Sequence, residues 1–250
     1  MSGRLYIVGL GPSDERWLTP EAQEALDAAQ DVIGYFPYVA RVPMREGQTR
    51  LASDNRVEID RARDALTRAA DGRIVAVVSG GDPGVFAMAA AVLEAVDHGD
   101  PQWRNLDIRI IPGVSAMQAA AARLGAPLGH DFCAISLSDN LKPWDIIARR
   151  LEHAAKGDFV IALYNPASRA RPTQIADAFA LLRQHLPGDR FVGLAKSVGR
   201  EKEEIILSSL DTVDPAQVDM STLVIIGASG TRRIARDADR DFVYTSRKAT

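Results

Sequence analysis

Short apolar runs of strand length alternate with helical patterns along most of the chain, and many of them end in glycine, proline or a polar residue. Runs rich in Val, Ile and Leu predict strands over residues 5–8, 31–34, 74–79, 107–111, 132–137, 159–164, 191–196, 204–209 and 222–226. Helical periodicity predicts helices over residues 20–29, 57–70, 85–96, 115–124, 144–155 and 173–185. This alternation is typical of an α/β protein whose sheet is largely parallel in the first half of the chain.

The strands crowd together late in the chain, which favours a second, mixed sheet. The segment GAPLGHD at residues 125–131 combines turn-forming residues with little periodicity. We therefore expect two α/β domains, residues 1–126 and 127–250, with a cleft between them.

Composition narrows the class of protein. The formal net charge of -3 gives no basic field for nucleic acid, and no stretch has the apolar length of a membrane span. A strand-like LYIVG follows the first residues at once, which argues against a signal peptide. The single cysteine, Cys133, fits a reducing compartment, so we expect a cytoplasmic protein that binds neither nucleic acid nor membrane.

Three predicted strands end in glycine-containing corners. The first, GLGPSD at residues 9–14, lacks the third glycine of a dinucleotide fingerprint, because Asp14 stands in its place. The second, SGGDPGV at residues 79–85, lets a ligand approach the backbone, and Asp82 is either a ligand-facing carboxylate or a helix cap. In the third, PGVSA at residues 112–116, Ser115 is a good helix N-cap.

Basic residues gather in other loops. Arg169 and Arg171 follow a predicted strand in LYNPASRAR, and a guanidinium matches a carboxylate well. The same two interpretations hold for all the basic residues in these loops: each is either a solvated surface charge or a contact to a polyanionic small molecule. The others are Lys196, Arg200 and the early Arg41 and Arg45. The four histidines are scattered without the spacing of metal ligands, so no metal site is expected.

The order of GLGPSD, SGGDPGVF and PGVSAMQAAAARLGAPLGHDF resembles the tetrapyrrole methylase family over nearly the whole chain. Three further segments, VIGYFPYV, LYNPASRARPTQ and GLAKSVGREKEEI, are similar to the branch that methylates C17 of a cobalamin precursor and contracts its ring. The resemblance implies two α/β domains, a homodimer, and S-adenosylmethionine, converted to S-adenosylhomocysteine, held between the domains.

Residue by residue, the resemblance implies cofactor contacts at Pro12, Gly80, Gly81, Asp82, Val85, Ser115, Ala116, Tyr164, Asn165, Ala195, Thr222 and Leu223. Asp82, Tyr164 and Ser115 are the candidates for proton transfer during ring contraction, and the sequence does not choose among them. The expected counter-charges for the carboxylates of the substrate, a precorrin, are Arg41, Arg45, Arg169, Arg171, Lys196 and Arg200.

Three rival functions remain. A sibling methylase acting at C20 or C11 would use the same cofactor loops. A nicotinamide-dependent oxidoreductase would need an acidic residue after the second strand, where the sequence reads Gly34-Tyr35-Phe36-Pro37. A non-catalytic tetrapyrrole-binding protein would bind the ring without affinity for S-adenosylmethionine.

Overall fold

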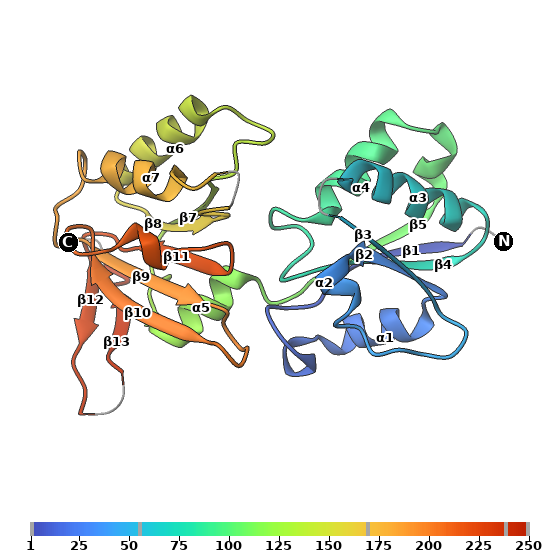
Figure 1. The fold of residues 1–250 in the computed structure, drawn as a ribbon, viewed down its shortest axis with the longest axis horizontal. Coiled ribbons are helices and arrows are strands. Elements are labelled where there is room, and N and C mark those ends of the chain that lie inside the picture. The colour runs from blue at the N-terminus through green and yellow to red at the C-terminus, as the bar shows by residue number, and fades with distance from the viewer. Residues whose placement is uncertain (1–2, 55–56, 169–170, 238–239, 249–250) are drawn as a thin grey trace. The chain divides into compact units, whose positions relative to one another are not determined.

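Two separate central sheets organise the chain (Figure 1). The computed structural model describes residues 3–54, 57–168, 171–237 and 240–248. Contacts divide it into two units, Met1–Ala116 and Met117–Thr250. The α/β class expected from the sequence is confirmed. In the described part of the chain, no helix has both the length and the apolar character that crossing a membrane requires.

All strands of the first unit's sheet run parallel, in the order β3-β2-β4-β1-β5. They are β1 (Arg4–Gly9), β2 (Asp31–Tyr35), β3 (Thr49–Ser53), β4 (Ile74–Ser79) and β5 (Asp107–Ile111). The helices are α1 (Pro20–Ala28), α2 (Phe36–Val39), α3 (Glu58–Ala70) and α4 (Met88–His98), with 3-10 turns at Glu15–Trp17 and Pro101–Asn105. Because the strands are parallel, their carboxyl ends and the loops that follow share one edge.

Helices cover both faces of this sheet (Figure 1). Leu5 and Ile7 of β1 pack with α3 and α4, whereas the alternate residues Tyr6 and Val8 pack with α1. This burial on both faces explains why the strands read as continuous apolar runs. Thr19 caps α1, accepting a hydrogen bond from the Ala22 N–H at 3.1 Å.

The second unit has a mixed sheet in the order β10-β9-β11-β8-β7, in which only β7 and β8 pair in parallel. Its strands are β7 (Phe132–Ser136), β8 (Val160–Tyr164), β9 (Phe191–Lys196), β10 (Glu204–Ser209) and β11 (Thr222–Ile226). Its helices are α5 (Ala116–Leu124), α6 (Trp144–Lys156) and α7 (Gln174–Leu182), with a 3-10 turn at Pro215–Gln217. Helices α6 and α7 bury one face, and Leu124 of α5 packs on the other at Gly193.

A small third sheet, in the order β12-β13-β6, completes the second unit. It consists of β12 (Thr231–Ile234), β13 (Phe242–Thr245) and β6 (Gly125–Ala126). Along β13 the burial alternates: Val243 and Thr245 are buried, whereas Phe242 and Tyr244 are exposed.

Several elements differ from the prediction. The sequence reading missed β3, β6, β12, β13 and α2; β3 and β12 are edge strands with few apolar residues. The helix expected from residue 85 begins at Met88, because Phe86 has a positive φ of 53°. The two units divide at 116/117, ten residues before the expected boundary at 126/127. Gly125 and Ala126 belong to the second unit because they pair with Val243 and Tyr244.

Candidate functional site

Three loops leave the carboxyl edge of the first unit's sheet from neighbouring strands. The first loop (residues 10–14) follows β1, the second (80–87) follows β4 and the third (112–115) follows β5. Strand β1 lies between the other two, so the loops are neighbours. This edge is where open α/β sheets usually bind ligands.

The first and second loops are joined backbone to backbone. The Gly11 N–H donates to the Gly81 carbonyl at 3.1 Å, and the Gly81 N–H donates to the Gly11 carbonyl at 2.8 Å. Their φ angles are +64° and +70°, in the left-handed region that glycine adopts without strain. The glycines therefore fix this junction.

Asp82 joins the second loop to the third. Its Oδ1 accepts from the Gly84 N–H at 2.8 Å, and its Oδ2 accepts from the Gly113 N–H at 3.1 Å. A Cβ atom placed on Gly113 would lie 2.4 Å from the Gly81 carbonyl oxygen and 2.9 Å from the Gly9 Cα. The glycine-containing corners singled out in the sequence thus converge in the first unit, and a side chain at Gly113 would collide with the backbone of Gly9 and Gly81.

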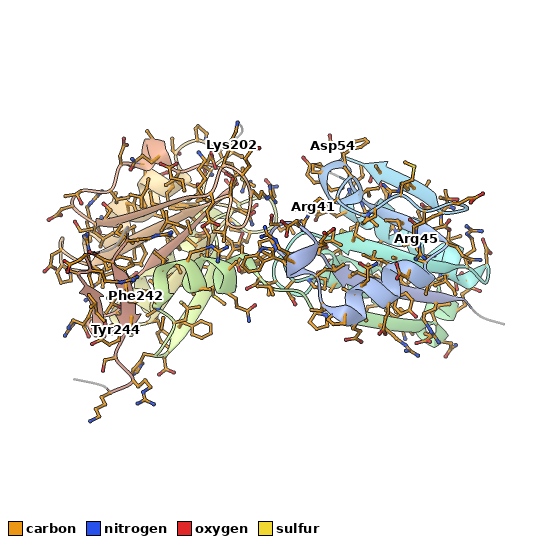
Figure 2. The ribbon with its side chains drawn as sticks, turned by 90° about the horizontal axis from the view of Figure 1, so that it is seen from below. Arg41, Arg45, Asp54, Lys202, Phe242 and Tyr244 are labelled. Atoms are coloured by element: carbon orange, nitrogen blue, oxygen red, sulfur yellow. The ribbon has the colours of Figure 1, made fainter. Side chains whose placement is uncertain are left out.

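Two arginines expected to bind substrate have different surroundings. Arg41 Nη2 donates to the carbonyl oxygens of Leu10 at 2.7 Å and Gly11 at 3.0 Å, so this guanidinium group fixes the first loop. Arg45 pairs with Asp27 in the last turn of α1 at 2.7 Å. Because β3 is parallel to β2, the connection carrying Arg45 returns to the amino edge, and Figure 2 shows Arg45 apart from Arg41. Arg45 is not brought to the loops.

The other predicted residues of the first unit lie in the loops as follows. Pro12 and Val85 are partly buried in the first and second loops, and Ser115 is buried directly before α5, which begins at Ala116. A Cβ atom on Gly81 would meet nothing closer than the Ala116 nitrogen at 3.7 Å, so Gly81 has open space on that side.

A second set of predicted residues gathers at one edge of the second unit's main sheet. Tyr164 ends β8 and Lys196 ends β9, while the antiparallel β11 begins at Thr222. Thr222 lies opposite Lys196, and Leu223 lies opposite Ala195. The sequence motifs of this half therefore also meet at a common edge.

Polar contacts fix these side chains. The Tyr164 hydroxyl accepts from the Met117 N–H in the first turn of α5 at 3.0 Å. Asn165, with a φ of +52°, donates from Nδ2 to the Ser136 Oγ at 2.9 Å. The Tyr164 hydroxyl is thus held at the amino end of α5.

Lys196 forms an ion pair with Asp219 at 2.6 Å. Burial raises the pKa of Asp219, but hydrogen bonds from Lys196 and Ser221 outweigh it and bring the pKa to about 2. The positive charge of Lys196 is therefore neutralised by Asp219 within the second unit, and a substrate carboxylate would compete with Asp219 for the ammonium group.

Arg171 is the best placed of the predicted counter-charges. Its side chain is only 12% exposed, and its Nε donates to the Ser168 Oγ at 3.3 Å and lies 3.8 Å from the Asp139 Oδ1. Its Nη1 is buried without a hydrogen-bond acceptor among the described residues. Arg169 lies outside the described residues, and Arg200 is exposed in the loop after β9.

Sequence reasoning missed three residues near the second loop. The Tyr38 ring covers Gly80, where a Cβ atom would lie 2.6 Å from the Tyr38 Cε1. Arg61 is buried and donates to the Ser53 Oγ and the Asp54 carbonyl, at 3.0 and 2.6 Å. Phe86 has a positive φ. Tyr38 and Phe86 each lie in a motif that carries the resemblance, VIGYFPYV and SGGDPGVF, whereas Arg61 had no such signal.

The loops offer placement rather than a nucleophile. Burial raises the pKa of the Cys133 thiol to about 11, which keeps it protonated at neutral pH. Among residues 3–54, 57–168, 171–237 and 240–248, no three His, Cys, Asp or Glu side chains group as metal ligands would. The open side of Gly81 and the small Ala116 fit a ligand that lies against the backbone, such as the adenosyl part of S-adenosylmethionine.

Comparison with known proteins agrees with this geometry. Residues 4–214 match the family described as Tetrapyrrole (Corrin/Porphyrin) Methylases. A Sinorhizobium sp. protein named precorrin-3B C(17)-methyltransferase is 57% identical over 99% of this chain and 97% of its own length. A Salmonella typhimurium protein named probable cobalt-factor III C(17)-methyltransferase is 44% identical over 91% of this chain and 93% of its own.

Among solved structures, the methyltransferase CobJ superposes with a TM-score of 0.94 at 49% identity, covering 98% of this chain and 100% of that one. The match to the family extends over most of the chain and includes all three loops of the first unit. The chain therefore belongs to the tetrapyrrole methylase family.

Proposed function

We propose that this chain transfers the methyl group of S-adenosylmethionine to C17 of precorrin-3B, with contraction of the ring to precorrin-4, in cobalamin biosynthesis. Two relatives support the choice of carbon, since both are named for C17. The observation that carries the proposal is the convergence of the loops at Gly11, Gly81 and Gly113.

S-adenosylmethionine supplies a methyl group already activated on a cationic sulfonium, so the work of the protein is placement. Residues of the first unit proposed to hold it are Pro12, Gly80, Gly81, Asp82, Val85, Ser115 and Ala116. Residues of the second unit proposed to hold it are Tyr164, Asn165, Ala195, Thr222 and Leu223. Asp82, Tyr164 and Ser115 are the proposed proton-transfer candidates; both Asp82 oxygens and the Tyr164 hydroxyl already accept main-chain hydrogen bonds.

The carboxylates of the substrate need cationic partners. Arg171 is the leading candidate, because its buried Nη1 can donate to one more acceptor. Lys196, Arg200 and Arg169 are further candidates, whereas Arg41 acts on the first loop and Arg45 is dropped from the set. We also propose a cytoplasmic homodimer, supported by the single cysteine and by the exposed apolar face of the small sheet.

The decisive experiment is incubation with precorrin-3B and methyl-labelled S-adenosylmethionine, followed by mass and NMR location of the label. We expect one label at C17 in a contracted ring. A label at C20 or C11 would identify a sibling methylase. Calorimetric titration with S-adenosylhomocysteine tests the non-catalytic alternative, which requires that no binding be seen.

A further inference from the structure

Phe86 lies in the second loop, two residues before α4 begins, and its backbone is in a conformation that bulky residues avoid. Its φ is +53°, in the left-handed region. Its side chain is nevertheless 51% exposed, so burial of the ring does not account for the strained backbone.

Hydrogen bonds on both sides hold this conformation. The Met88 N–H donates to the Ser79 Oγ at 3.3 Å, and the Ala89 N–H donates to the Pro83 carbonyl at 2.9 Å. Before Phe86, Asp82 fixes the chain through the Gly84 and Gly113 N–H groups. The fold therefore sets the direction of a large apolar side chain at the edge of the sheet where the three loops meet.

A second exposed phenylalanine follows the adjacent strand. Phe36 begins α2 directly after β2, which pairs with β4, and it is 57% exposed. Tyr38 of the same short helix covers Gly80, which ties α2 to the second loop. Phe36 and Phe86 thus belong to neighbouring strand ends joined by a packed aromatic ring.

We propose that Phe86, assisted by Phe36, is a substrate-positioning residue whose ring packs on the apolar face of the tetrapyrrole. This inference rests on the proposed function. A tetrapyrrole carries its carboxylates at the rim and presents extended apolar faces, so cations and aromatic rings recognise different parts of it. The strain at Phe86 is retained because the ring has to point at the substrate.

Phe86→Asn separates the two roles of the residue, because asparagine tolerates positive φ but lacks the ring. We expect an unchanged or higher Tm, an unchanged Kd for S-adenosylhomocysteine, and a KM for precorrin-3B raised about tenfold. Phe86→Tyr should keep the KM. Phe132→Asn is the matched control, since Phe132 is similarly exposed but begins β7 in the second unit.

Fluorescence titration with uroporphyrin, a stable ring with a carboxylate rim, gives a readout independent of turnover. We expect weaker binding to Phe86→Asn than to the parent. A parent-like KM and parent-like uroporphyrin binding would overturn the aromatic role, as would equal losses of cofactor and substrate binding. Failure of the parent to methylate precorrin-3B, with Phe86-dependent uroporphyrin binding retained, would overturn the proposed function instead.

Discussion

Individual residues carry roles that their type alone did not reveal. Asp82 is recognisable in the sequence as a site residue, yet only the coordinates show both of its oxygens bound to loop N–H groups. Arg41 and Arg45 look alike in the sequence, but the parallel path of β3 sends Arg45 to the opposite edge. Sequence identifies candidate chemistry; long-range contacts decide which candidates meet.

Replacement of Asp82 tests its role as the clip between the second and third loops. Asp82→Ala removes two charge-assisted hydrogen bonds, so we expect a lower Tm and a Kd for S-adenosylhomocysteine raised at least about tenfold. Asp100→Ala is the control, because Asp100 also accepts a main-chain N–H two residues on, from Gln102 at 2.9 Å, but at a 3-10 turn before β5. Normal cofactor binding by Asp82→Asn with turnover lost would favour proton transfer instead.

Asp31 shows a residue whose role is structural. It is fully buried at the start of β2, and hydrogen bonds from Arg73 lower its pKa. Asp31→Asn should lower the free energy of unfolding by about 2 kcal/mol at neutral pH. Its stabilisation is present above the pKa of the unfolded chain and is lost as the pH falls toward the lower folded value. Denaturant titrations from about pH 5 to about pH 2 should therefore show a smaller loss of unfolding free energy in the variant than in the parent. An equal loss in the two proteins would contradict the role.

At the scale of elements, the strands with continuous apolar runs were predicted well, since burial on both faces leaves a plain signal. Strands β3 and β12 were missed because an edge strand needs few apolar residues, and β6 because it has only two. Register and the meeting of loops depend on pairing between distant segments, which a single sequence does not encode locally.

Two glycines test whether the junction between the first and second loops is a binding surface. Gly81 and Gly47 have similar φ angles, +70° and +75°, and neither has an atom close enough to clash with a Cβ. Alanine at either position should therefore cost about 1 kcal/mol of stability through the backbone. Only Gly81→Ala should also weaken binding of S-adenosylhomocysteine, measured by calorimetry, because its methyl group projects into the open side of the junction. Equal cofactor affinities in the two variants would argue against a site there.

At the scale of the whole molecule, each of the two units has a sheet edge at which predicted site residues gather. The second unit adds a small sheet whose outer face pairs Ile234 with Phe242 and Arg232 with Tyr244. Phe242 is 48% exposed and Tyr244 38%, and Figure 2 shows the two on one strand. An exposed apolar sheet face of this kind is typical of a surface that another chain covers.

The proposed homodimer can be tested at this face. Phe242→Glu combined with Tyr244→Glu places two charges on it, and we expect light scattering after gel filtration to show a dimer for the parent and a monomer for the variant. Leu141→Glu is the control, since Leu141 is also exposed but lies in the loop before α6. A parent that is monomeric would contradict the dimer itself, whereas a dimeric double variant would contradict this surface. These substitutions leave the buried face of β13, with Val243 and Thr245, unchanged. A monomeric double variant whose Tm equals that of the parent diluted to its monomeric state would therefore show that association was lost and folding was not.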